Sequence, residues 1–90
     1  MVWAVEFAPA AAKDLRRLDR TTAQRLLKFL DERIRRGEDP RAIGEALRGE
    51  RLRAYWKYRV GDYRLICRIE DARVVVTVVR VGHRGDIYRD

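Results

Sequence analysis

The sequence predicts an α+β fold in which a small antiparallel or mixed β-sheet of about four strands carries two N-terminal helices on one face. Two features of the residue pattern predict it. Apolar residues recur at helical spacing in the first half of the chain, and over residues 51–70 they alternate with polar ones as in strands. Because 90 residues suffice for one hydrophobic core, residues 1–90 are expected to form a single domain.

The N-terminal segment is expected to form a strand over residues 2–7 and then a helix. The buried face of the strand would carry Trp3, Val5 and Phe7. Pro9 suits the first turn of the helix, because the N–H group that proline lacks would be unpaired there. This helix should end near Asp19.

A second helix is expected to follow at once. Thr21 and Gln24 have the spacing of a capping box, and helical periodicity continues to about Arg36, before Gly37. The dipeptide at 39–40 then predicts a third, short helical turn before Gly49. Its apolar residues would be Ile43, Ala46 and Leu47.

Residues 51–70 have the pattern of a β-hairpin with one apolar and one cationic face. Gly61 and Asp62 fit a two-residue turn with glycine first, and pairing Val60 with Tyr63 aligns the apolar faces of both strands. This register places Arg59 directly opposite Arg64. Facing arginines repel each other unless an anion lies between them, so the pair indicates a binding site, or else two long side chains that splay into solvent.

The last strand is expected at Val74–Val79, where an unbroken apolar run is typical of a strand covered on both sides. Gly82 and Gly85 flank His83 and Arg84, which predicts a turn that returns these side chains toward the sheet.

The net charge of +7 favours a polyanionic partner such as nucleic acid, the ribosome or an acidic protein. All but three of the 21 basic residues are arginine, whose planar guanidinium can grip a phosphate in two places. A GC-rich genome would also raise the arginine content, so only arginines grouped by the fold indicate a site. The three lysines are Lys13, Lys28 and Lys57.

Several classes of function are not supported. One cysteine, Cys67, and one histidine offer no disulfide and no recognisable metal-ligand set, and no glycine-rich phosphate loop precedes a helix. We therefore expect neither a metal nor another cofactor. The chain has no apolar run long enough for a membrane span and no signal sequence, so a cytoplasmic protein without membrane contact is expected.

The remaining feature is a strip of cations and tyrosines, which is the combination that binds single-stranded RNA. Its members are Arg51, Arg53, Tyr55, Lys57, Arg59, Arg64 and Arg68, with Arg84 and Tyr88 from the tail. Binding alone would explain the strip.

RNA also carries its own nucleophile, the 2′-hydroxyl, so cleavage would need only alignment, stabilisation of the phosphorane charge and proton transfer. Arginine stays protonated, so Tyr88 or His83 would have to move protons. Taken singly, Tyr88 is more often a packed terminal aromatic and His83 a turn residue.

Three segments together resemble the RelE/ParE toxin superfamily: Leu47-Arg48-Gly49, residues 55–66 with their Gly-Asp-Tyr-Arg hairpin, and Val81-Gly82-His83-Arg84 with Ile87-Tyr88. The resemblance covers nearly the whole chain. It implies a toxin that an antitoxin encoded beside it neutralises, and, for RelE-like members, cleavage of messenger RNA in the ribosomal A site.

The resemblance also implies residue roles. Lys57 and Arg59 match strand cations for phosphate contact and transition-state charge, and Arg64 matches the arginine that stabilises the scissile phosphate. Arg84 matches an arginine that assists the leaving group, and Tyr88 a tyrosine that acts as base or orients the 2′-hydroxyl.

Two features depart from the best-known RelE toxins: the hairpin is tighter, and His83 stands where lysine is common. ParE-like members share the fold but inhibit DNA gyrase without catalysis, and they lack the complete cation set. Retention of that set favours the RelE-like branch. A gyrase inhibitor and a basic interaction module without activity stay as alternatives.

Overall fold

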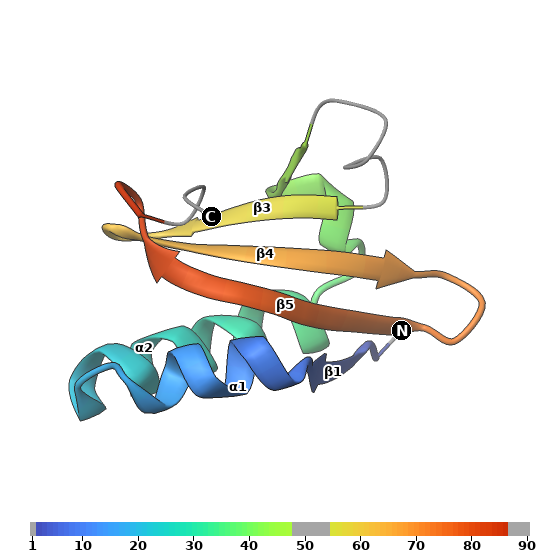
Figure 1. Ribbon diagram of the computed structural model, residues 1–90. Helices are drawn as coiled ribbons and strands as arrows, with labels where there is room; N and C mark the ends of the chain where they lie inside the picture. Colours follow the sequence, from blue (N-terminus) through green and yellow to red (C-terminus); the bar gives the residue numbers. More distant parts are fainter. Residues whose placement is uncertain (1, 48–54, 87–90) are drawn as a thin grey trace.

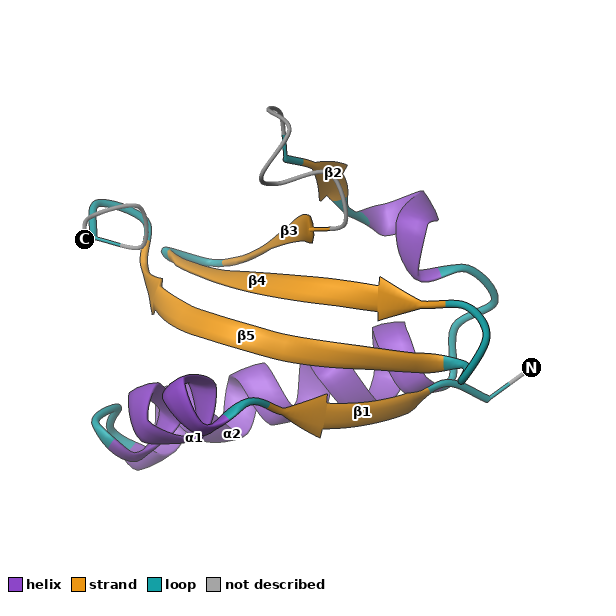
Figure 2. Cartoon of the chain, turned by 45° about the vertical axis from the view of Figure 1, so that its right-hand side comes forward, coloured by secondary structure: helices purple, strands orange, loops and turns teal. Residues whose placement is uncertain are grey.

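The structure is a computed structural model that describes residues 2–47 and 55–86. Within these residues, five strands form one mixed sheet in the order β1-β5-β4-β3-β2, with the helices on one face (Figures 1 and 2). β1 (Ala4–Phe7) runs parallel to β5 (Val75–His83), and the other neighbours are antiparallel. The predicted fold class is confirmed, with one strand more than expected.

The two predicted helices are present. α1 (Pro9–Arg16) begins at Pro9, as the sequence indicates. α2 (Arg20–Phe29) continues as a π-helical turn, η1 (Leu30–Arg35), so the second helix reaches the expected length. The predicted capping box is wrong. Asp19 caps α2 instead: its carboxylate accepts the backbone N–H of Thr22 at 3.0 Å and the hydroxyl of Thr22 at 2.6 Å.

The short third turn exists, but only over the 3₁₀-helix η2 (Pro40–Ile43). Ala46 was expected in this turn and lies instead in β2 (Glu45–Ala46), which pairs with β3 (Tyr55–Val60). Leu47 was also expected there, and its N–H donates to the carbonyl of Tyr55 at 3.0 Å. Gly44 is the physical reason: its backbone is extended and so close to the ring of Tyr58 that a Cβ would lie 2.8 Å from Cε1.

The hairpin between β3 and β4 (Tyr63–Glu70) has the predicted register. Val60 pairs with Tyr63, Arg59 pairs with Arg64, and Gly61 has a positive φ of 60°. The part of the predicted strand at 51–54 lies outside the described residues.

β5 is central, as predicted, between β1 and β4. It continues to His83, so the turn expected around His83 and Arg84 begins one residue later, where the N–H of Asp86 donates to the carbonyl of His83 at 2.8 Å. Ile66 pairs with Arg80 but Cys67 with Val78, so Val79 is an extra residue that forms a β-bulge. The bulge reverses the alternation of every later side chain in β5.

The hydrophobic core lies between the helices and one sheet face. Tyr58, Leu65 and Cys67 from the hairpin pack with Leu26 and Ile34 from the helical layer, and all five are at most 1% exposed. Neither α1 nor α2 covers the opposite face of the sheet (Figure 1). Within the described ranges, no helix has the length and apolarity needed to cross a membrane.

Candidate functional site

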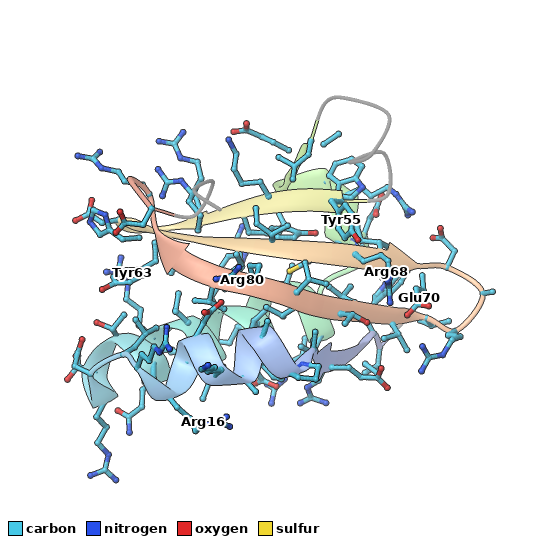
Figure 3. All side chains as sticks on the ribbon, viewed as in Figure 1. Arg16, Tyr55, Tyr63, Arg68, Glu70 and Arg80 are labelled. Carbon is cyan, nitrogen blue, oxygen red and sulfur yellow. The ribbon has the colours of Figure 1, made fainter. Side chains whose placement is uncertain are left out.

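The face of the sheet opposite α1 and α2 carries five of the predicted site residues. Strand alternation turns Tyr58 and Val60 of β3 toward the core, so the residues between and beside them face the other way. Pairing then sets Tyr55 beside Arg68 and Arg59 beside Arg64. We call this set the open-face strip: Tyr55, Lys57, Arg59, Arg64 and Arg68. Figure 3 shows nitrogen-tipped side chains projecting from the sheet away from the helices.

Arg59 and Arg64 occupy neighbouring positions but have different surroundings. Arg59 is exposed, whereas Arg64 is only 8% exposed. The Nη1 group of Arg64 donates to the carbonyl oxygens of Gly61 at 3.0 Å and Tyr63 at 2.9 Å. The hairpin turn therefore holds the guanidinium of Arg64 in a fixed position, while Arg59 can adapt to a ligand.

Arg84 reaches the same end of the sheet through its backbone. Its N–H donates to the carbonyl of Asp62 at 2.8 Å, which ties the segment after β5 to the hairpin turn. In β5, the residue paired with Arg64 is Gly82, which has no side chain. The backbones of three arginines, one each from β3, β4 and the segment after β5, thus come together at the hairpin end.

The arginines at this end form no ion pair within the described residues, and neither do others such as Arg17, Arg25 and Arg33. Other arginines form ion pairs: Arg41 with Asp71 at 2.7 Å, and Arg73 with Glu6 and Glu70. Across residues 2–47 and 55–86, no ion pair involves Arg59, Arg64 or Arg84. Lys57 differs from them, because its Nζ lies 3.6 Å from Glu45 of β2. No carboxylate in the part of the chain that the structure describes therefore pairs with any of the three arginines at the hairpin end.

His83 lies apart from this group. Its ring contacts Tyr63 edge to face at a centroid distance of 5.6 Å, and Tyr63 packs against the core on the helix side. Both residues line a pocket of about 320 Å³ with Asp14, Arg17 and Leu18 of the helical layer. Tyr63 and Arg80 lie at this side of the sheet in Figure 3. The expected grouping of His83 with the arginines is therefore not what the structure has, because the bulge at Val79 turns His83 to the other face.

A family model described as the ParE toxin of the type II toxin–antitoxin system parDE matches residues 5–88. The chain belongs to the RelE/ParE toxin superfamily. It is 36% identical to the toxin RelG of Mycobacterium tuberculosis over 89 residues, which cover 99% of each chain. It is 34% identical to the mRNA interferase toxin RelE of Escherichia coli over 92 aligned residues, covering 100% of this chain and 94% of that protein.

Solved structures agree with this assignment. The toxin–antitoxin complex RelBE2 of Mycobacterium tuberculosis matches with a TM-score of 0.84 and 32% identity, covering 96% of this chain and 95% of that one. The isolated RelE toxin of Escherichia coli matches with a TM-score of 0.72 and 32% identity, covering 90% and 83%. The protein is thus a RelE-like toxin of a type II toxin–antitoxin system.

Two charged neighbours of the toxin's site could not be found in the sequence. Glu45 faces Lys57 from a two-residue strand, which is too short to show a periodic pattern. Arg25 of α2 approaches the hairpin, with its Nη1 2.8 Å from where a Cβ of Gly61 would stand. This proximity depends on how α2 packs on the sheet.

Three predicted site residues of the toxin, Arg51, Arg53 and Tyr88, lie outside the described residues. Within the described ones, no three His, Cys, Asp or Glu side chains come together in a group that could hold a metal ion. What the described site offers is positive charge and hydrogen-bond donors, which suit binding and stabilising a phosphate that gains charge.

Proposed function

We propose that this toxin is a ribosome-dependent endoribonuclease that cleaves messenger RNA in the A site. The observation that supports this most directly is the grouping of Arg59, Arg64 and Arg84 around one end of the open sheet face without carboxylate partners in the described chain. A relative that is 34% identical over its near-full length is named an mRNA interferase.

The proposed reaction uses the RNA's own 2′-hydroxyl. This group loses its proton to a base and bonds to the adjacent phosphorus, while the bond from phosphorus to the 5′-oxygen breaks. The departing oxygen takes up a proton, leaving a 2′,3′-cyclic phosphate and a 5′-hydroxyl. No protein nucleophile is required, so the protein's part is to align the groups and to stabilise the extra negative charge.

Each proposed role follows from position and from the family resemblance. The anchored Arg64 would bind the scissile phosphate, with Lys57 and Arg59 beside it to bind phosphate oxygens and balance the developing charge. Arg84 would assist the leaving oxygen, and Tyr88 would act as base or orient the 2′-hydroxyl. The flanking residues Arg51, Arg53, Tyr55 and Arg68 would hold the rest of the RNA, with tyrosine stacking on a base.

The proposal also covers partners and setting. One solved relative is the toxin–antitoxin complex RelBE2, so a cognate antitoxin should bind and neutralise this chain. The net charge of +7 should assist docking to ribosomal RNA in the cytoplasm. The reaction as written needs no cofactor, and residues 1–90 would act as a single domain.

Primer extension on messenger RNA bound to translating ribosomes tests the proposal. The wild-type toxin should produce cuts within the A-site codon, and Arg64→Ala and Arg84→Ala should each lower the cleavage rate on the order of 10²-fold. Arg73→Ala is the matched control, because Arg73 is an exposed arginine already paired with Glu6 and Glu70. An intact message after prolonged incubation with folded wild-type toxin would rule the proposal out.

The second candidate function is inhibition of DNA gyrase, which the description of the matching family model favours because it names a ParE toxin. Loss of gyrase supercoiling activity at toxin concentrations that leave ribosome-bound message intact would support it. A toxin that affects neither assay would be a basic interaction module without activity.

A further inference from the structure

The last residues of β5 are held from two sides, and only one of the two partners is a strand. On the inner side, β4 pairs with β5 as far as His83, and the carbonyl of Asp62 accepts the N–H of Arg84. On the outer side, β1 pairs with β5 only as far as Val78. The outer edge of β5 therefore extends beyond its neighbouring strand, next to α1.

Asp14 of α1 occupies the place where β1 has ended. Its Oδ2 accepts the backbone N–H of Val81 at 2.8 Å, a bond that a strand partner would otherwise make. The same oxygen accepts Nε of Arg80 at 2.9 Å, and Oδ1 accepts Nη2 of Arg80 at 3.4 Å. The carboxylate of Asp14 thus binds both a backbone N–H and a side chain at the edge of β5.

The surroundings of Asp14 keep this carboxylate charged and in place. Its side chain is 11% exposed. Burial opposes ionisation, but the hydrogen bonds from Arg80 and from the Val81 N–H outweigh it and lower the pKa of Asp14 below its ordinary value. A charged acceptor forms stronger hydrogen bonds than a neutral one, so the link between α1 and β5 is a strong one.

We propose that Asp14 is a positioning residue for Arg84, acting through the Val81 N–H to fix the path of the chain that carries this arginine. The inference rests on the proposed nuclease function, in which Arg84 assists the leaving group. Val81 lies three residues before Arg84, and Gly82 between them restricts the backbone less than any other residue would. The hydrogen bond from the Val81 N–H to Asp14 on the outer edge of β5 therefore limits the positions that Arg84 can adopt.

The effect should appear in the chemical step. A displacement of about 1 Å at a reacting group can lower a rate on the order of 10²-fold, so Asp14→Ala should lower the single-turnover cleavage rate by roughly tenfold to hundredfold. The ribosome concentration that gives half the maximal rate should change by less than about twofold, because Asp14 is not proposed to touch RNA.

A double-mutant cycle separates positioning from general destabilisation. If Asp14 acts through Arg84, the loss caused by Asp14→Ala should nearly vanish in an Arg84→Ala background. Asp14→Asn, which keeps an oxygen for the Val81 N–H but loses the charge, should fold and show an intermediate loss. Arg80→Met, which removes the ion pair and keeps the backbone anchor, should have the smallest effect of the three. Asp71→Ala is the control, since it breaks an arginine–aspartate ion pair with Arg41 at the opposite end of β5 from Arg84.

The outcomes distinguish the two claims. If the wild-type toxin cleaves and the Asp14 and Arg84 effects multiply independently, or Asp14→Ala and Asp14→Asn keep the wild-type rate, the positioning role is wrong and the nuclease function stands. If the wild-type toxin does not cleave, the proposed function is wrong, and the positioning role is wrong with it. Should Asp14→Ala fail to fold, the same cycle built with Asp14→Asn decides between these outcomes.

Discussion

Arg64 donates a hydrogen bond of 3.0 Å from its Nη1 group to the carbonyl oxygen of Gly61, at the tip of the hairpin. A second bond of 2.9 Å from the same nitrogen reaches the carbonyl of Tyr63. Within the described part of the chain, Nε and Nη2 make no hydrogen bond. One edge of the guanidinium is thus fixed to the turn, and in the proposed function the donors of Nε and Nη2 bind the phosphate. Lysine carries its three donors on one nitrogen, so it cannot present separate edges to the turn and to a phosphate as the planar guanidinium does.

We therefore expect Arg64→Lys to behave much like Arg64→Ala, with a cleavage rate reduced on the order of 10²-fold. Arg59 is exposed and has no comparable anchor, so Arg59→Lys should lose less than about tenfold, because lysine keeps the charge. Single-turnover primer extension on programmed ribosomes measures both. Near wild-type cleavage by Arg64→Lys would show that only the charge of Arg64 matters, and not the planar arrangement of its guanidinium donors.

His83 and Tyr88 can be separated as candidates for proton transfer. His83 contacts Tyr63 on the helix side, away from the three arginines, so His83→Ala should lower the cleavage rate by less than about tenfold. Tyr88→Phe should lower it by about 10² to 10⁴-fold while ribosome binding persists, because only the hydroxyl is removed. Cleavage rates and sedimentation with ribosomes provide the two measurements. The reverse order of the two losses would assign the proton transfer to His83.

The hairpin was predictable because two independent signals agree on its register. Gly61 and Asp62 specify a two-residue turn, and the apolar faces on either side match only when Arg59 meets Arg64. The facing of β5 could not be predicted. A run of valines has no alternation, so nothing marked Val79 as the bulged residue, and the bulge decides that His83 faces the helix side.

The start of α2 was mispredicted because two capping signals stand side by side. Thr21 and Gln24 have the capping-box spacing, but Asp19 lies in an extended conformation and its carboxylate reaches the N–H of Thr22. The outer anchor from Asp14 to Val81 was also invisible, because it joins residues far apart in sequence and depends on where β1 ends.

The core contains two groups whose ionisation should unfold the protein at high pH. Burial raises the pKa of the Tyr58 hydroxyl well above its ordinary value of 10, and it raises the pKa of the Cys67 thiol from 9 to about 12. Both groups ionise earlier in the unfolded chain than in the folded one. The stability that they contribute is therefore complete below pH 9 and is lost as the pH rises toward the folded-state values.

We expect the free energy of unfolding to fall above pH 9, by up to about 1.4 kcal/mol per pH unit for each group. Tyr58→Phe should show a shallower decline above pH 10, and Cys67→Ala a shallower decline from pH 9 onward. At neutral pH, Tyr58→Phe should cost about 1 to 3 kcal/mol, because it leaves the Pro40 carbonyl without its 2.6 Å hydrogen bond. Urea titrations at several pH values measure these slopes. Equal slopes for all three proteins would exclude both groups as the cause.

Val74 stores backbone strain in the turn between β4 and β5. Its φ is 54°, in the left-handed region that β-branched residues rarely adopt, and its N–H donates to the carbonyl of Asp71 at 3.1 Å. Its side chain is half-buried against the core, so any truncation also loses apolar contact.

Comparing two truncations of Val74 isolates the strain. Val74→Gly and Val74→Ala both lose the contact, but only glycine adopts this φ freely, so the glycine variant should be the more stable by about 1 to 2 kcal/mol in urea unfolding. In regular strands and helices alanine is the more stable of the two by about 0.5 to 1 kcal/mol. Finding that ordinary order at Val74 would mean that the turn relaxes to a negative φ and holds no strain.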